Sequence, residues 1–252
     1  QAAKILGDVK HKNASSKLIP LLKHDNARVR FFAAQALGRL KHKEAVKPLL
    51  KMLEENNDED VYIRHAGVLA LYRIGEIPPI TALVKSPNKS LRLAAVLILR
   101  KFQSKDIAKF LNDEDNYIVT ETARAINDDW SIKGALPALA QILTNKRFKT
   151  SEPLLRRAIN AALRVGSEKD LNNLLAFAKR TDVSGILRSE ALATISSWTS
   201  PSVLDRVDGR YRGEIKRDAN TVKSKIEKEI PHFLNDKDPN VLAGISEVLI
   251  TL

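Results

Sequence analysis

The side chains that could carry out chemistry are few in this chain, and they form no known constellation. The histidines are His11, His24, His42, His65 and His232; no two stand four residues apart and none precedes a Glu. Cysteine is absent, which excludes disulfides, thiolate zinc sites, iron–sulfur clusters and C-x-x-C-H haem attachment. No Walker loop, G-x-G-x-x-G or G-x-S-x-G motif occurs. The sequence therefore predicts no catalytic residue, no metal site and no cofactor.

Three acidic clusters have two interpretations each. The runs 58–60 and 113–115 could bind calcium, but neither has the Gly and Glu spacing of an EF-hand loop, so helix capping is the favoured interpretation. In Asp128-Asp129-Trp130, two carboxylates stand beside one of two tryptophans and could grip a sugar or a cation. The favoured alternative is a turn whose indole packs on the neighbouring repeat.

The basic charge is concentrated in the first half of the chain. The net charge is +12, and residues 1–112 hold 21 Lys and Arg against 10 Asp and Glu, whereas residues 113–252 hold 21 against 20. Such asymmetry can mark a surface for nucleic acid or an acidic partner, with Lys41, Lys43, Lys47 and Lys51 as the candidate basic surface. A solvated lysine-rich face is the favoured alternative.

One short segment recurs seven times, and we call it the repeat marker. It is an aliphatic residue followed in five copies by Arg, and the copies begin at Val29, Ile63, Leu91, Ile118, Leu155, Leu187 and Val241. Three residues after its second position stands a mostly small residue, and seven after it an aliphatic one. These positions share one face of an α-helix, so each marker predicts a helix that packs closely on its neighbours.

A second helix is expected before each marker helix. Five of the six intervals between markers are 27 to 37 residues, which accommodates two helices and two turns. Four of the preceding segments carry a proline at the same place, namely Pro20, Pro48, Pro137 and Pro231, and we expect these prolines to bend the helices. The pattern predicts an all-α chain, an α-solenoid.

At the first marker the chain resembles HEAT repeats of the short, HEAT-like variety. A D-x-x-V-R-like turn is present in residues 25–30, followed by Ala-Ala-Gln-Ala-Leu-Gly at 33–38. The resemblance extends over about residues 14–252 and implies one domain, 1–252, wound as a right-handed superhelix that serves as a binding scaffold. The expected hairpins, about seven, are residues 15–40, 43–75, 77–102, 104–127, 134–165, 168–198 and 221–252, with 1–13 as the remnant of an earlier helix.

The last interval is 54 residues, and the excess is an insertion at residues 199–220. Together with Leu154-Leu-Arg-Arg and Trp198, its Asp205-Arg-Val-Asp-Gly-Arg-Tyr-Arg run resembles the HEAT segment of large bacterial exported proteins. In those, a sugar-dehydrogenase-like propeller precedes the repeats and a cytochrome c domain follows them. The resemblance implies a middle domain of a haem-binding redox protein in the periplasm or outside the cell. The family's C-x-x-C-H is absent here, so the redox chemistry would lie outside this segment.

The insertion is the candidate docking element for a partner. It mixes apolar residues with arginine, a composition typical of recognition surfaces, and we expect Tyr211 as its anchor with Arg206, Arg210 and Arg212 around it, the last two at the rim. Two glycines could permit a sharp turn that presents them. In the alternative, the loop folds back over the sixth hairpin and Tyr211 packs near Trp198.

The leading functional hypothesis is a non-catalytic scaffold, monomeric as an isolated domain, whose partners are neighbouring domains of its own chain or another protein. The alternative is a nucleic-acid-binding protein of the HEAT-like DNA glycosylase type, with the recurring marker arginines as a phosphate ladder. We favour a structural role for those arginines, in bridges to the acidic turns. A phycobilin lyase-like protein is a third possibility, from fold analogy alone. No apolar run is long enough to span a membrane, and no signal-peptide pattern is present.

Overall fold

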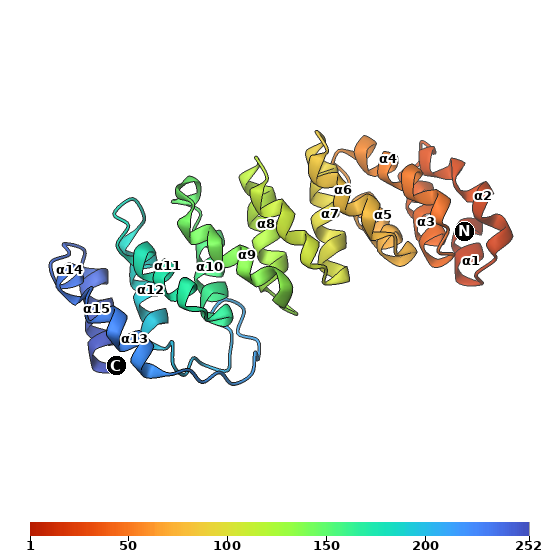
Figure 1. Cartoon of the computed structure of the whole chain (residues 1–252). Coiled ribbons are helices and arrows are strands. Elements are labelled where there is room, and N and C mark those ends of the chain that lie inside the picture. The colour runs from red at the N-terminus through yellow and green to blue at the C-terminus, as the bar shows by residue number, and fades with distance from the viewer. Residues whose placement is uncertain (252) are drawn as a thin grey trace. The chain divides into compact units, whose positions relative to one another are not determined.

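The computed structural model describes residues 1–251, and the chain divides into two compact units, residues 1–118 and the part from Val119 onward. We describe each unit by itself. Both are rows of helical hairpins (Figure 1). Within the described residues there is no β-strand, and strand-like pairing is limited to one isolated bridge between Leu204 and Tyr211. The predicted all-α solenoid of helical hairpins is confirmed.

In unit 1, each hairpin joins a short first helix to a longer second one, which we call the B helix. The B helices are α3 (Ala27–Arg39), α5 (Val61–Ile74) and α7 (Lys89–Phe102). The helices before them are α1 (Ala2–Asp8), α2 (Ser15–Leu18), α4 (Val46–Asn56) and α6 (Ile77–Ala82). Five 3₁₀ turns complete the unit: η1 (Lys12–Ala14), η2 (Pro20–Lys23), η3 (Lys43–Ala45), η4 (Leu83–Lys85) and η5 (Lys105–Asn112). The next B helix, α8 (Asn116–Asn127), begins in unit 1 and continues into unit 2.

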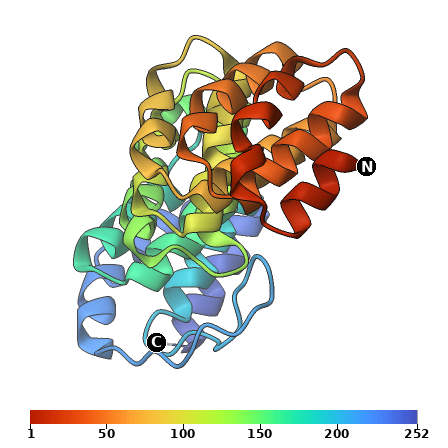
Figure 2. The ribbon, with the colours of Figure 1, turned by 90° about the vertical axis from the view of Figure 1, so that its right-hand side faces the viewer.

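Unit 2 repeats this plan with one long interruption. Its B helices are α10 (Glu152–Val165), α12 (Gly185–Ser196) and α15 (Pro239–Thr251). The other elements are η6 (Lys133–Ala135), α9 (Leu136–Ala140), η7 (Gln141–Thr144), η8 (Lys146–Phe148), α11 (Glu168–Ala178), α13 (Ala219–Ile226) and α14 (Ile230–Leu234). Between α12 and α13 the chain forms the long loop seen along one edge of this unit (Figures 1 and 2).

The repeat marker describes the core correctly. All seven markers lie on B helices, as predicted. The residue three positions after the second marker residue is buried in every copy, and so is the aliphatic residue seven positions after it, except in the last copy. There, Leu249 is 47% exposed, because no described helix covers that face of α15.

Small residues set the spacing of the first B helices. A Cβ added to Gly38 of α3 would lie 2.6 Å from the Cα of Ala70 on α5, closer than real Cβ contacts. The same relation holds between Gly7 of α1 and Ala36 of α3, at 2.7 Å. These helices touch backbone to backbone, as the markers predicted, but at small residues other than those that the markers single out: Gly67 of the second marker packs on the Leu53 side chain instead.

The four prolines do not bend the interiors of their helices, so this prediction was wrong. Pro20 begins η2, Pro48 is the third residue of α4, and Pro137 and Pro231 are second residues of α9 and α14. In the first turn of a helix the main-chain N–H has no partner within the helix, and proline costs little there. Pro48, Pro137 and Pro231 therefore mark the first turn of an α-helix, whereas Pro20 stands at the junction of α2 and η2.

The acidic runs at residues 58–60 and 113–115 have two structural roles. The last residues, Asp60 and Asp115, accept main-chain N–H groups at the start of α5 and α8, at 2.8 Å from Tyr62 and Tyr117. The first residues, Asp58 and Asp113, pair with marker arginines, as described below. The favoured prediction of helix capping is confirmed for these runs.

Candidate functional site

The long loop of unit 2 folds into a tight turn. Since α13 begins at Ala219, we call residues 199–218 the insertion loop. Leu204 and Tyr211 face each other in the antiparallel bridge, between two main-chain hydrogen bonds of 2.7 Å. Gly209 adopts φ +71° in the turn, a left-handed conformation that glycine takes without strain. Bridge partners of this kind hold their side chains close together on one face.

A buried ion pair lies beneath this turn. Arg212 Nε is 2.9 Å from Asp205 Oδ2, and the two side chains are only 10% and 1% exposed. Asn160 of α10 donates to the same carboxylate oxygen at 2.9 Å. The other Arg212 contacts, at 2.7–2.9 Å, are the Asp208 carboxylate and the main-chain oxygens of Asn127 and Asp129. One arginine thus joins the loop to the end of α8 and the turn after it.

Hydrogen bonding keeps the Asp205 carboxylate charged. Burial opposes ionisation, but the main-chain N–H of Val207 (2.8 Å), Arg212, Asn160 and the main-chain N–H of Asp208 (3.3 Å) all donate to it. Together these donors lower the pKa of Asp205 below its usual value. The carboxylate therefore fixes the conformation of the loop.

Of the four candidate docking residues, three are exposed and the side chain of the fourth is almost fully buried. Tyr211 is 70% exposed, and Arg206 is exposed as well. Arg210 is 52% exposed and forms an ion pair with Asp129 at 2.9 Å. The prediction that Arg212 lies at the rim is wrong: its guanidinium is almost fully buried, because it holds two carboxylates and two carbonyls.

Two further arginines, not singled out from the sequence, fasten the loop to the helices. Arg164 of α10 donates to the main-chain oxygens of Ser202 (3.3 Å) and Leu204 (2.9 Å). Arg217 donates to the main-chain oxygens of Trp198 (2.7 Å) and Leu163 (2.5 Å). Burial lowers the pKa of both guanidinium groups. Their role could not be predicted from the sequence, because their partners are main-chain oxygens, which every residue type has.

The loop folds back onto the hairpins, but not as the alternative expected. The group over the buried Trp198 ring is the Arg217 guanidinium, 4.8 Å from the ring centroid. Tyr211, expected near Trp198 in that alternative, points instead to an exposed position. Cation–π packing of this kind protects the indole while the guanidinium satisfies main-chain carbonyls.

Three large apolar side chains are exposed around this ionic base. They are Leu204 (50% exposed), Tyr211 (70%) and Trp130 (74%), and we call them the apolar patch. Trp130 follows Asp129, whose main-chain N–H donates to Asp208 at 2.9 Å and whose carboxylate pairs with Arg210. The expectation that the Trp130 indole packs on the neighbouring repeat is wrong.

The candidate basic surface is partly neutralised. Lys43 lies 2.7 Å from Glu76, and Lys51 lies 3.0 Å from Glu54. The hydrogen bond to the glutamate, and then its charge, raise the pKa of each lysine. Lys41 and Lys47 are exposed. Two of the four predicted cations therefore already have a carboxylate partner within unit 1.

The marker arginines have the structural role that we favoured. Arg64 pairs with Asp58 at 2.6 Å, and Arg92 pairs with the buried Asp113 at 2.8 Å. Arg30 donates to two main-chain oxygens, and Arg156 and Arg188 pair with Glu190 and Asp236. They are satisfied inside the repeats and do not form a phosphate ladder.

Residues 1–251 contain no group of three or more His, Cys, Asp or Glu side chains arranged to hold a metal ion. They also contain no helix with the length and apolar character needed to cross a bilayer.

Comparison with known proteins gives one family match. Residues 1–71, from α1 into α5, match the family described as HEAT repeats. No curated protein matches the chain. The hairpins and this match together support a helical-repeat protein with a HEAT-like, scaffold-type fold.

Several solved structures are also similar. An engineered protein is 15% identical (TM-score 0.46), covering 94% of this chain and 67% of that one. The complex of CpcE and CpcF of phycocyanin lyase from Nostoc sp. PCC7120 is 17% identical (TM-score 0.36; 100% and 88% covered). A second engineered protein is 17% identical (TM-score 0.30; 94% and 97% covered).

Proposed function

We propose that this chain is a non-catalytic helical-repeat scaffold whose apolar patch docks a protein partner, either a neighbouring domain or a separate chain. The observation that carries the proposal is the exposure of Leu204, Tyr211 and Trp130 over a buried ionic base. Exposed aromatic side chains on a rigid support are typical anchors of protein interfaces. Because the base fixes the loop, little conformational entropy is lost when a partner binds.

The charged groups beneath the patch favour a positioning role over catalysis. Asp205 and Asp208 both accept hydrogen bonds from Arg212, and Asp128 is held by Arg157 at 2.7 Å. Each of these carboxylates is committed to an arginine, so none is placed as a general base. A general base must reach a substrate proton, whereas these groups face the body of unit 2.

Site-specific photocrosslinking tests the proposal. We would place benzoylphenylalanine at position 211 in the complete gene product expressed in its host, and at position 186 as the control. Ile186 is also exposed (58%) but lies on α12, away from the patch. We expect one defined crosslinked partner at position 211, lost in a variant with Trp130→Ser and Leu204→Ser. Equal crosslinking at position 186, or none at position 211, would contradict the proposal.

A finer proposal assigns the scaffold to a larger exported redox protein, and with it an export to the periplasm. Its support is the resemblance of Trp198, Pro201, Asp205 and Gly209 to the propeller–HEAT–cytochrome proteins. In this chain these residues build the loop: Trp198, Pro201 and Asp205 are buried and Gly209 turns it. The motif thus predicts a conserved conformation rather than redox chemistry. Sequencing the flanking gene for a propeller and a C-x-x-C-H motif is the test.

A further inference from the structure

The B helices of unit 1 have an unusual charge composition. Helices α3, α5 and α7 hold nine Lys and Arg residues and no Asp or Glu. The B helices α10, α12 and α15 of unit 2 each contain a glutamate. Side chains on the unit 1 helices therefore cannot neutralise one another.

Three of the nine cations form a series at the ends of the helices. Arg39, Arg73 and Lys101 each stand nine residues after a marker arginine, one on each B helix. The first two meet across α3 and α5, where Arg73 donates to Gln35 at 2.8 Å. Arg39 has one acidic neighbour, Asp8 at 2.8 Å.

The environment of this series favours an incoming carboxylate. Burial, followed by the charge of Arg39, lowers the pKa of Arg73. Lys101 is exposed and lies 5.9 Å from the centroid of the Tyr72 ring. Arg39 and Arg73 therefore repel each other, and the Asp8 carboxylate of α1 is paired with Arg39, so an acidic ligand beside Arg73 and Lys101 would offset the remaining positive charge.

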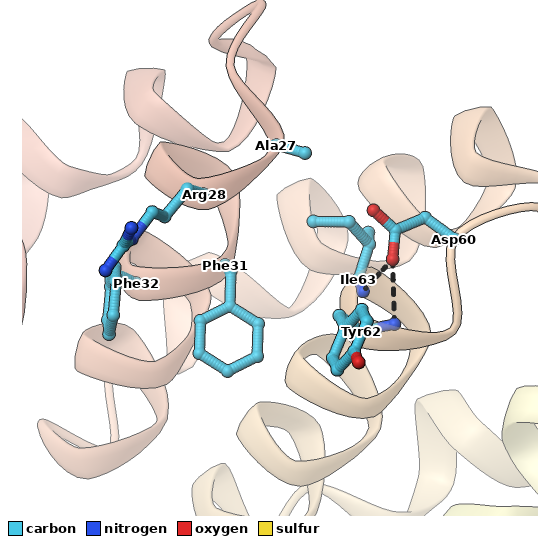
Figure 3. Close-up of a pocket in the computed structure, with 7 residues that line it drawn as sticks. All are labelled: Ala27, Arg28, Phe31, Phe32, Asp60, Tyr62 and Ile63. Atoms are coloured by element: carbon cyan, nitrogen blue, oxygen red, sulfur yellow. Dashed lines mark hydrogen bonds between the residues drawn. The ribbon is translucent and has the colours of Figure 1, made fainter.

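An apolar groove lies at the other end of the same helices (Figure 3). It has a volume of about 320 Å³ and lies between the first turns of α3 and α5. Phe31 and Tyr62 point into it from opposite sides, and Arg28 lies along the ring of Phe32 (Figure 3). Tyr62 is 72% exposed, so the groove is open to a partner.

We propose that this face binds an acidic segment of a partner protein, with one apolar side chain in the groove and carboxylates on Arg39, Arg73 and Lys101. The span fits a short peptide. From Tyr62 to Arg73 is eleven residues of helix, or about 16 Å. An extended peptide covers that distance in about five residues. The partner would thus carry an aromatic or aliphatic anchor about five residues away from its acidic cluster.

Nucleic acid fits this face less well than a peptide does. The Asp60 carboxylate lies in the wall of the groove, where it would repel a phosphate. Two of the rings on which bases could stack are already covered on one side: Arg28 lies over Phe32, and Tyr72 packs against Phe102 at 4.9 Å between centroids. A peptide with an apolar side chain and nearby carboxylates matches both ends of the surface, the apolar groove and the basic series.

Fluorescence anisotropy with the full chain tests the inference. The probe is a fluorescein-labelled peptide with one Phe, a five-residue Gly-Ser spacer and four Glu. Two comparison peptides replace Phe by Ser or every Glu by Gln, and a labelled oligothymidine of similar length represents nucleic acid. We expect saturable, salt-sensitive binding of the first peptide, and weaker binding of the other three.

Matched variants then locate the site. Replacing Arg39, Arg73 and Lys101 by Gln should weaken binding of the first peptide about tenfold or more, which is about 1.4 kcal/mol. The control replaces Lys47, Lys85 and Lys105 by Gln, which removes the same charge from exposed positions of unit 1 outside the B helices. Tyr62→Ser should weaken the Phe peptide but leave the Ser peptide unchanged. Circular dichroism confirms that each variant is folded.

Three results would overturn the inference. They are the absence of saturable peptide binding, an equal loss in the control variant, and tighter binding of oligothymidine than of the peptide. The last result would assign the surface to nucleic acid. Since none of these residues belongs to the insertion loop, failure here leaves the apolar patch untouched.

Discussion

The two units join their B helices in different ways. In unit 1, Gly38 on α3 and Ala70 on α5 bring the backbones together, and these helices carry no carboxylate. In unit 2, glutamates on the B helices reach across: Glu190 pairs with Arg156, and Glu247 accepts from Ser196 at 3.4 Å. One repeat pattern therefore gives two kinds of B helix. Those of unit 1 carry only basic charge, part of which is paired with carboxylates of the turns and of α1, whereas those of unit 2 carry some of their own carboxylate partners.

The insertion loop adds a second difference. Unit 2 contains a segment without regular structure that is fastened by Arg164, Arg212 and Arg217. Such a loop buries little apolar surface, so its order depends on charged contacts with main-chain carbonyls and carboxylates. Unit 1 depends on packing, and the two units should respond to different substitutions.

The largest effect is expected for Arg212→Ala. This change removes the cation that pairs directly with Asp205, which is 1% exposed, and breaking a buried ion pair costs about 3–5 kcal/mol. We expect the free energy of unfolding to fall by that order in urea titrations, with protease cleavage appearing in the loop. The control, Arg206→Ala, removes an exposed arginine of the same turn and should change stability by less than about 0.5 kcal/mol. Similar losses in both variants would contradict a structural role specific to Arg212.

The next effect concerns packing in unit 1. Gly38→Val places methyl groups where even a Cβ would meet the Ala70 backbone at 2.6 Å, so α3 and α5 must separate. Overpacking of this kind costs about 1–3 kcal/mol. Thermal unfolding should show the loss, whereas Ala82→Val, at an exposed position of α6, should be nearly neutral. A neutral Gly38→Val variant would show that the helices have room to adjust.

Much of this fold could be predicted from the sequence, because the spacing of apolar residues in the repeat marker depends only on local helix geometry. The spacing of Val29, Ala33 and Leu37 requires a helix with one buried face, and each later copy requires the same. The position of the prolines within their helices could not be predicted, because residue type alone does not distinguish a first turn from a helix interior. The division into two units could not be predicted either, because the repeat pattern continues without change across the boundary between them.

The candidate site was only partly predictable. The length of the last interval located the insertion, and its aromatic and arginine content suggested a surface. Which arginine is exposed depends on long-range contacts: Arg212 is buried by Asn127 and Asp129, about 85 residues earlier in the chain. Arg164 and Arg217 bind main-chain oxygens, and any residue type could supply those oxygens.

A smaller effect separates the helix caps of the two units. Asp60 accepts from the Tyr62 and Ile63 N–H groups at 2.8 and 3.2 Å, whereas the Ser184 cap of α12 reaches Leu187 N at 3.5 Å. Losing a good cap costs about 1 kcal/mol, so Asp60→Ala should destabilise the chain by about that amount. Ser184→Ala should cost less, because its hydrogen bond is long. The free energy of unfolding of both variants, measured by chemical denaturation, checks this prediction. Equal losses in the two variants would contradict it.

The smallest effect is a difference in pH dependence between two carboxylates of unit 2. Burial raises the pKa of Glu190 despite the opposing charge of Arg156, whereas the pKa of Asp205 is lowered by its hydrogen bonds against the effect of burial. A raised carboxyl pKa means that the folded state binds the proton more tightly, so Glu190 favours folding as the pH falls toward about 4.3, its unfolded value. The lowered pKa of Asp205 gives stability above about pH 3.9 that is lost as the pH falls through the folded value.

These opposite signs can be separated by measuring stability against pH in two variants. In Glu190→Gln, the relative gain in stability as the pH falls toward about 4.3 should disappear, so the variant loses stability more steeply on acidification than the parent. In Asp205→Asn, which is less stable throughout, the loss below about pH 3.9 should become shallower, by less than about one proton in the slope. Urea titrations at half-unit pH intervals resolve the two windows. If both variants change the slope of stability against pH in the same direction, the prediction is contradicted. One of the two carboxylates would then have a pKa shifted in the direction opposite to the one given above.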